Sequence, residues 1–558
     1  MVIMCLHAKL ASCMVALAAM CSGSAQQTNR QGPCSASECI DVDERDSLSW
    51  LQWSRVRKVA HGPDELGGLG WLHPGPTQPA PFPIVYSVLG LGGQPYARAI
   101  VGIADSCPPI SIDGLKEQPE VTIRATGSGG LPYDFPVRVC EAALPIGHQG
   151  GTFGGRPVPA MTQDPTKYLL VGDTGLRLKV KNLGNCKEFS DSETYGVPMC
   201  RTYEAFNKSN VKGDVQSLDN WPLYDLFTSA AETNPDLVVH LGDYLYRQTA
   251  CPREHGCDDV SSGSWWGDTW RGWFSDFFDP ARPLLESAPW IVIRGNHEDC
   301  SRAGHGWFMF MDPRPLPPNW SAGYCESYTE PYSIPFKHEQ LLIIDDTAIK
   351  PKAGGIDHFD FLPACSAGEA QAVSANRHED PSQNLSFIDA QVQMYTRHMR
   401  RLADLAKGHK TNIYVGHRPL FAFACNHSEY TSLDWTMQQA WQACAVDLGS
   451  VVLAISGHMH WFTGVEYAGR AHPTQVVVGH GGTKLIPNSV PEQEFEGSQL
   501  EILGAKVSRG SSKSAFGYAT LTSGDGDSPL AFSAMEMSPG SLTAKTFWEA
   551  SVPREPRY

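Results

Sequence analysis

The sequence lacks three patterns that mark common protein classes. No two of its 16 cysteines form a Cys-x-x-Cys pair, so a zinc site made of thiolates is not expected. The chain has no heptad pattern and no internal repeat, which argues against coiled coils and solenoids. Beyond the N-terminal segment, no uncharged apolar run is long enough to span a membrane. We therefore expect a globular chain with no stable membrane span.

Basic residues are also fewer than acidic ones. The chain has 44 Lys and Arg against 60 Asp and Glu, which gives a formal net charge of −16 at pH 7. Such a surface repels nucleic acids and anionic lipids, so we do not expect a nucleic-acid scaffold. An anionic substrate would need a local reversal of this field, which a pair of bound cations would supply.

The length of 558 residues predicts more than one domain. Lys9, an apolar run and a stretch of small residues make residues 1–25 resemble a signal peptide, so we expect a secreted or periplasmic protein. Residues 26–48 are polar and are interpreted as a leader. Short β-type runs separated by Gly and Pro predict a small β-rich domain over residues 49–160, followed by a large domain over residues 161–558.

Export would allow disulfide bonds. Three cysteines lie in the expected signal segment, and the remaining thirteen leave at least one free thiol. Connectivity cannot be derived from a sequence alone, but proximity along the chain makes four pairs reasonable. These are Cys107 with Cys140, Cys186 with Cys200, Cys251 with Cys257, and Cys300 with Cys325.

Short apolar runs of strand type recur from residue 167 onward, and several end in Gly plus a side chain that can bind a metal. Ligands of α/β proteins bind at the carboxyl ends of strands, and glycine allows the sharp turn found there. Residues 222–232 and 387–407 have helical spacing between these runs. The strand-end motifs are Gly172-Asp173, Gly242-Asp243, Gly295-Asn296, Gly416-His417 and Gly457-His458-Met459-His460.

Taken together, these side chains have the composition of a site for two metal ions. A carboxylate should bridge the ions, and imidazoles and an amide oxygen should complete their coordination. We assign Asp243 to the bridge, Asp173 to the first metal, and Asn296 with His417 to the second. His458 and His460 can serve different metals. Any one of these residues alone is more often a turn or packing residue, but the ordered set favours a metal site.

The same motifs resemble those of the calcineurin-like metallophosphoesterase superfamily, with a core over residues 167–485. The resemblance implies an α/β fold, a four-layer α/β/β/α sandwich, preceded here by the small β-rich domain. It also implies a hydrolase in which a hydroxide activated by the metals attacks a phosphate ester. The partner would be a small phosphorylated substrate, and a protein partner is unknown.

One position departs from most members, which carry Asp-x-His where this chain has Gly175. Purple acid phosphatases share this loss and supply a tyrosine from a Gly-Asp-x-x-Tyr motif, which Tyr246 matches here. The resemblance implies a centre with Fe(III) and a divalent metal (Zn, Mn or Fe); two divalent metals are the alternative, with Tyr246 as a packing residue. The motif Tyr414-Val415-Gly416-His417 differs from the usual Val-x-x-His.

We expect an acid phosphatase-like monoesterase in which His297 protonates the leaving oxygen, oriented by Glu298 or another carboxylate. His305, His427 and His480 are weaker candidates for substrate contacts. An Mn or Zn phosphodiesterase or nucleotidase is the alternative within the superfamily. A non-catalytic exported binding protein on a degenerate phosphatase scaffold is a third possibility. No Gly-x-Ser-x-Gly motif with suitable flanks supports a serine hydrolase.

Overall fold

The computed structural model describes the chain from residue 82 onward, with internal gaps. All described residues fall in one compact unit, Gly68–Tyr558. The expected signal peptide, the leader and two expected disulfides (Cys186–Cys200 and Cys251–Cys257) lie outside them and stay predictions. The described ranges are 82–128, 134–179, 214–216, 220–246, 267–318, 320–321, 323–349, 385–426, 429–432, 434–487, 489, 492 and 500–555.

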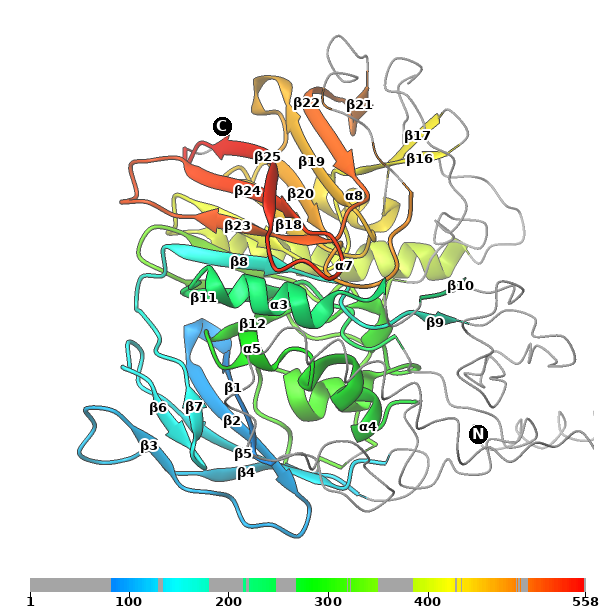
Figure 1. Ribbon diagram of the computed structural model, residues 1–558. Coiled ribbons are helices and arrows are strands. Elements are labelled where there is room, and N and C mark those ends of the chain that lie inside the picture. The colour runs from blue at the N-terminus through cyan, green and yellow to red at the C-terminus, as the bar shows by residue number, and fades with distance from the viewer. Residues whose placement is uncertain are drawn as a thin grey trace, which may run out of the picture. The chain divides into compact units, whose positions relative to one another are not determined.

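The larger of two main sheets has ten strands in the order β25-β24-β23-β8-β11-β12-β1-β2-β5-β4 (Figure 1). Its centre is parallel, because β8, β11, β12 and β1 run in one direction. The strands in chain order are β1 (Ile84–Leu89), β2 (Pro95–Gly102), β4 (Thr122–Thr126), β5 (Val137–Ala143), β8 (Lys167–Val171), β11 (Leu237–His240), β12 (Trp290–Val292), β23 (Gly517–Thr522), β24 (Leu530–Glu536) and β25 (Lys545–Val552).

The second main sheet has eight strands in the order β13-β14-β15-β18-β20-β19-β22-β21. Strands β14, β15, β18 and β20 are parallel to one another. The strands in chain order are β13 (Tyr332–Pro335), β14 (Gln340–Ile343), β15 (Asn412–Val415), β18 (Val451–Ser456), β19 (Phe462–Tyr467), β20 (Thr474–Val478), β21 (Glu501–Ile502) and β22 (Ala505–Lys513).

The N-terminal β-rich region expected from the sequence is present. Four of its strands, β1, β2, β4 and β5, extend the ten-stranded sheet. The other three, β3 (Ile110–Ile112), β6 (Gly151–Phe153) and β7 (Arg156–Val158), form a small sheet of their own. The region also contains the disulfide Cys107–Cys140, which confirms one of the four expected pairs. A second expected pair, Cys300–Cys325, is confirmed in the larger region.

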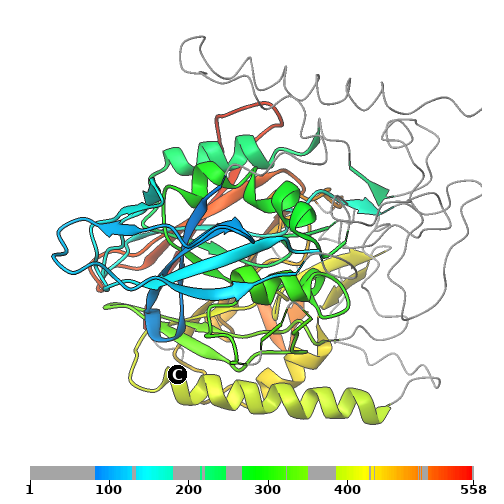
Figure 2. The same ribbon diagram turned by 90° about the horizontal axis from the view of Figure 1, so that it is seen from below.

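The two longest helices of the described residues match those expected from the sequence. Helix α3 (Leu223–Glu232) confirms the helix expected over 222–232, and α7 (Leu385–Ala406) confirms the longer one. Figure 2 shows α7, in yellow-green, on the opposite side of the strands from α3, in green. The remaining α-helices of the described residues are short: α4 (Trp270–Trp273), α5 (Arg282–Leu285), α6 (Gly304–Gly306) and α8 (Trp435–Gln442).

Neighbouring side chains of the central strands point into different hydrophobic cores. Leu169 and Val238 face one core with side chains of α3, whereas their neighbours Leu170 and Val239 face a core shared with β15 and β18 of the other sheet. Successive side chains of a strand point to opposite faces, so an uninterrupted apolar strand fills two cores. A third core packs Tyr414 and its neighbours against α7 and α8. No helix of the described residues is long and apolar enough to cross a membrane.

Candidate metal centre

All six core metal-binding residues predicted from sequence follow the carboxyl ends of parallel strands. Asp173 follows β8, Asp243 follows β11 and Asn296 follows β12, all in the ten-stranded sheet. His417 follows β15, and His458 and His460 follow β18, in the eight-stranded sheet. Because parallel strands end at one edge, each sheet presents its polar side chains together.

Three of these residues have left-handed backbone conformations. The φ angles are 58° at Asp173, 61° at Asp243 and 72° at His458. Such angles are uncommon outside glycine, and they cluster at functional sites where the surrounding structure imposes them. Gly242, which directly precedes Asp243, has φ 96°, and a Cβ there would lie 2.7 Å from Nδ1 of His417. The turn after β11 therefore requires glycine for conformation and for space.

One group of donor atoms surrounds Nε2 of His417. This nitrogen lies 3.0 Å from Oδ1 of Asn296, 3.2 Å from Nδ1 of His458 and 3.3 Å from Oδ2 of Asp243. Oδ1 of Asn296 is also 2.8 Å from Nδ1 of His458. Four donors from four strand ends thus converge at one point.

A second group surrounds the hydroxyl of Tyr246. This oxygen is 2.8 Å from Nε2 of His460, and it donates to Oδ2 of Asp243 at 2.9 Å or to Oδ1 of Asp173 at 3.2 Å. The ligand atoms of Asp173, Asp243 and His460 lie within 4.8 Å of one another, as do those of Asp243, His417 and His458. Asp243 belongs to both groups and joins them.

Backbone carbonyls fix how two of the histidines face the centre. Nδ1 of His417 lies 2.7 Å from the carbonyl of Leu241, and Nδ1 of His460 lies 3.1 Å from the carbonyl of Lys484. A carbonyl only accepts, so each Nδ1 carries a proton and each Nε2 is the ring nitrogen that faces the centre. Both rings are therefore oriented for metal binding.

The charges of the centre also fit bound cations. Burial raises the pKa of Asp173 well above its usual value. Burial opposes ionisation of Asp243 too, but His417 and His297 hold the pKa of that carboxyl well below its usual value. Asp243 in turn raises the pKa of His417 to about 10, against the effect of burial. Without cations, protons must neutralise this buried cluster, and cations can replace them. Its nitrogen and oxygen donors suit Fe, Zn or Mn.

His297 lies beside the second group. Its backbone nitrogen donates to Oδ1 of Asp243 at 2.9 Å, and its ring stacks on Tyr246 at 3.9 Å between centroids. Glu298 was one candidate for the carboxylate that orients His297, but its carboxylate contacts backbone groups instead. Its carboxylate accepts four backbone N–H groups, those of Asp243, Tyr244, Leu245 and Gly295, at 2.8–3.2 Å. Glu298 therefore holds the turn after β11 against the turn after β12.

The weaker histidine candidates have structural contacts. Nδ1 of His305 lies 3.2 Å from Oδ2 of Asp268, and Nε2 of His480 lies 3.3 Å from the carbonyl of Met535. His427 lies outside the described residues. Sequence reasoning missed Arg418, a buried residue with Nη1 3.3 Å from Nε2 of His458. Its place directly after His417, before an apolar segment, was the available signal.

A fold with two such donor groups at its strand ends defines a metal-dependent phosphoesterase, an enzyme that hydrolyses phosphate esters. The chain belongs to the calcineurin-like phosphoesterase family, whose model matches residues 167–462. Among solved structures, the chain is similar to one described as the structure of PhoD, with 10% sequence identity and a TM-score of 0.45; the match covers 86% of this chain and 92% of the other. None of the curated proteins matches the chain.

Proposed function

We propose that the chain is a secreted phosphomonoesterase of the purple acid phosphatase type. Its first metal, Fe(III), would be held by Asp173, Tyr246 and His460. Its second, a divalent Zn, Mn or Fe ion, would be held by Asn296, His417 and His458, with Asp243 bridging the two. When bound, the cations lower the pKa of water and offset the negative charge of the phosphate.

The position of the Tyr246 hydroxyl carries this proposal. It lies within 3.2 Å of oxygens of Asp173 and Asp243 and of Nε2 of His460, inside the donor group assigned to the first metal. Its oxygen therefore points at two carboxylates and an imidazole, the groups assigned to the first metal. Burial raises the pKa of Tyr246 well above its usual value, so without cations it is a hydrogen-bond donor. A trivalent cation bound to the Tyr246 oxygen would favour its deprotonated, phenolate form.

Space around Gly175 supports the same assignment. This position carries a histidine ligand in most members that the sequence resembles. Here a Cβ at Gly175 would lie 2.8 Å from Cδ2 of Tyr246 and 2.8 Å from the carbonyl oxygen of Tyr244. The tyrosine ring therefore fills the room that a histidine would use, and glycine at residue 175 accommodates it.

His297 is the proposed general acid. Its backbone is tied to Asp243, which belongs to both donor groups, and its ring lies on Tyr246, so the imidazole is held next to the proposed metal site. A histidine at this place can protonate the leaving oxygen as the P–O bond breaks. The guanidinium of Arg418, beside His458, is the proposed positive contact for the phosphate.

Three further assignments belong to the same proposal. The three cores, one between the sheets and one under the helices on either side, support a four-layer α/β/β/α order. Residues 49–160 would form the small β-rich domain and 161–558 the catalytic domain. The two disulfides support an oxidising compartment, and hence a secreted or periplasmic location.

A phosphodiesterase or nucleotidase with two divalent metals is the alternative, and the protonated Tyr246 of the cation-free site favours it. Metal analysis with a visible spectrum separates the two. About two metals per chain including iron, with a broad absorption band that Tyr246→Phe abolishes, are expected for the tyrosinate centre. Two metals without a band would support the alternative. No bound metal, and no hydrolysis after adding Fe, Zn or Mn, would contradict both.

A further inference from the structure

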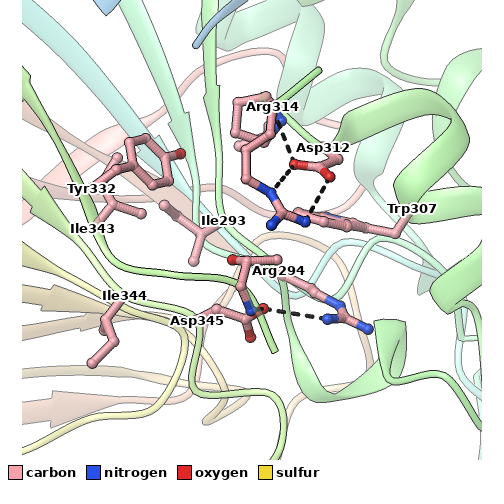
Figure 3. A pocket seen from close by; sticks show the side chains of 12 residues that line it. Ile293, Arg294, Trp307, Asp312, Arg314, Tyr332, Ile343, Ile344 and Asp345 are labelled. Atoms are coloured by element: carbon pink, nitrogen blue, oxygen red, sulfur yellow. Dashed lines mark hydrogen bonds and ion pairs between the residues drawn. The ribbon is translucent and has the colours of Figure 1, made fainter. Parts of the chain in front are cut away.

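A buried arginine lies directly behind the turn that carries Asn296 and His297. Arg294 is 2% exposed and follows β12. Its Nε donates to the carbonyl of Glu298 at 2.9 Å, and its Nη1 donates to the carbonyl of Glu326 at 2.9 Å. Nη1 also lies 3.3 Å from Oδ2 of Asp345, the pair drawn in Figure 3. The guanidinium therefore connects the Asn296–Glu298 turn to two other segments of the chain, those of Glu326 and Asp345.

The third nitrogen of this guanidinium contacts a disulfide. Nη2 of Arg294 lies 3.5 Å from Sγ of Cys325 and 3.7 Å from Sγ of Cys300. The guanidinium carbon lies 4.8 Å from the ring centre of Phe308 and 5.2 Å from that of Trp307. The two sulfurs contact one edge of the guanidinium and the aromatic rings lie over its plane. These contacts together restrict the orientation of the Arg294 side chain. Its location relative to the turn thus depends on the disulfide.

The backbone between the turn and Cys325 is equally close-packed. Ala303 donates its N–H to the carbonyl of His297 at 3.1 Å, and Gly304 donates to the carbonyl of Asp299 at 3.0 Å. A Cβ at Gly304 would lie 2.6 Å from Sγ of Cys325. This sulfur therefore packs closely against a residue that neighbours the segment holding His297.

We propose that the Cys300–Cys325 disulfide, acting through Arg294, holds the Asn296–Glu298 turn in its working position, so that reducing this one bond lowers activity without unfolding the protein. The inference rests on the proposed roles of Asn296 and His297. Arg294 is a positioning residue, because it contacts the turn and not the reacting atoms.

The reaction is thiol–disulfide exchange with a dithiol reductant. A thiolate of the dithiol attacks one sulfur, the Cys300–Cys325 bond breaks, and a mixed disulfide forms. The second thiol of the reductant then closes its own disulfide, leaving Cys300 and Cys325 as two thiols that take the two protons. Cys300 and Cys325 are half-buried residues and not part of a fully enclosed core. The Arg294 guanidinium favours the departing thiolate. Two free thiols cannot stay as close as a bonded pair, so the contacts of Arg294 loosen.

A pair of double variants tests this device. Cys300→Ser with Cys325→Ser removes the disulfide behind the turn, and Cys107→Ser with Cys140→Ser removes the one in the N-terminal β-rich region as a control. We expect the first variant to lose activity about tenfold or more, as is common when support of a metal ligand is lost. The control should lose thermal stability and keep its kcat.

The substrate pair gives a readout that a purely structural effect would not move. Because His297 is the proposed acid, its displacement should reduce kcat for an alkyl phosphate more than for p-nitrophenyl phosphate, whose leaving group needs little protonation. The dithiol should produce the same unequal loss in the wild type and in the control, with folding followed by circular dichroism. It should not further change the variant that lacks Cys300 and Cys325.

Four outcomes contradict the proposal. Equal losses for both esters, or a variant without Cys300 and Cys325 that keeps wild-type kcat, would overturn it. If that variant does not fold, Arg294→Lys decides: the unequal loss is expected there too, and wild-type kinetics would overturn the role of Arg294. A wild-type chain that hydrolyses neither ester would overturn the proposed function itself, whereas an active wild type that is insensitive to the dithiol would overturn this inference alone.

Discussion

The backbone nitrogen of His458 donates to Oδ2 of Asp173 at 2.8 Å. The two residues are far apart in the sequence and follow strands of different sheets, β18 and β8. This bond therefore joins the two sheet edges at the metal centre. Asp173 is thus held by the opposite sheet through one oxygen while its other oxygen faces Tyr246.

Asp173→Asn should separate stability from activity. Burial already favours the protonated form of Asp173 when no cation is bound, and Asn is a neutral side chain of the same shape that can still accept from His458. We expect the metal-free variant to be as stable as the metal-free wild type or more so, while bound metal and hydrolysis are lost. Thermal unfolding in the presence of a chelator, together with metal analysis, measures both effects. A variant that keeps two metals would contradict the assignment of Asp173.

Gly242→Ala should reduce activity and stability because of crowding as well as backbone strain. An alanine at φ 96° costs about 1–2 kcal/mol, and its Cβ would also lie 2.7 Å from Nδ1 of His417 and from Cα of Gly295. Gly504→Ala is the matched control, because Gly504 has φ 75° and no atom within 4 Å of an added Cβ. The control should lose stability by the strain alone and keep full activity. Similar kinetics for both variants would show that the turn after β11 tolerates a side chain.

The metal residues were predicted from a local pattern, an apolar run followed by glycine and a polar side chain. All parts of this pattern lie within a few consecutive residues. The sequence alone therefore indicates which side chains follow strand ends. The parallel pairing of β1 with β12 could not be predicted in this way, because Val88 and Trp290 are distant in the sequence and nothing local encodes their pairing. Arg294 was missed for the same reason, since its partners Glu326 and Asp345 lie in other segments.

Glu298→Gln should loosen the centre although it changes one atom. Each carboxylate oxygen of Glu298 accepts two backbone N–H groups. A glutamine presents an NH₂ group to two of these donors and leaves them buried without a partner. Each unsatisfied buried group costs about 1–3 kcal/mol, so we expect a clear loss in the free energy of unfolding and in metal affinity.

The neighbouring Asp299→Asn is the control for Glu298→Gln. The Asp299 carboxylate is half-buried and accepts the N–H of Ser301 at 2.7 Å, a bond that asparagine can also accept. Urea unfolding and metal titration should show a large change for Glu298→Gln and a small one for Asp299→Asn. Equal changes for the two variants would mean that losing backbone hydrogen bonds to Glu298 does not reduce the stability or the metal affinity of the protein.

His480 should make the protein less stable at acid pH. It is fully buried, its Nδ1 has no hydrogen-bond partner among the described residues, and burial lowers its pKa to about 4. The unfolded chain, with an ordinary histidine pKa of about 6.5, binds this proton first as the pH falls. The free energy of unfolding should therefore decrease by about 1.4 kcal/mol per pH unit between about pH 6.5 and pH 4 from this residue. In His480→Gln, which cannot titrate but can donate to the Met535 carbonyl, this part of the slope should disappear. Urea unfolding of both proteins at several pH values within that window measures the difference, and parallel pH profiles would show that His480 is not buried in its neutral form.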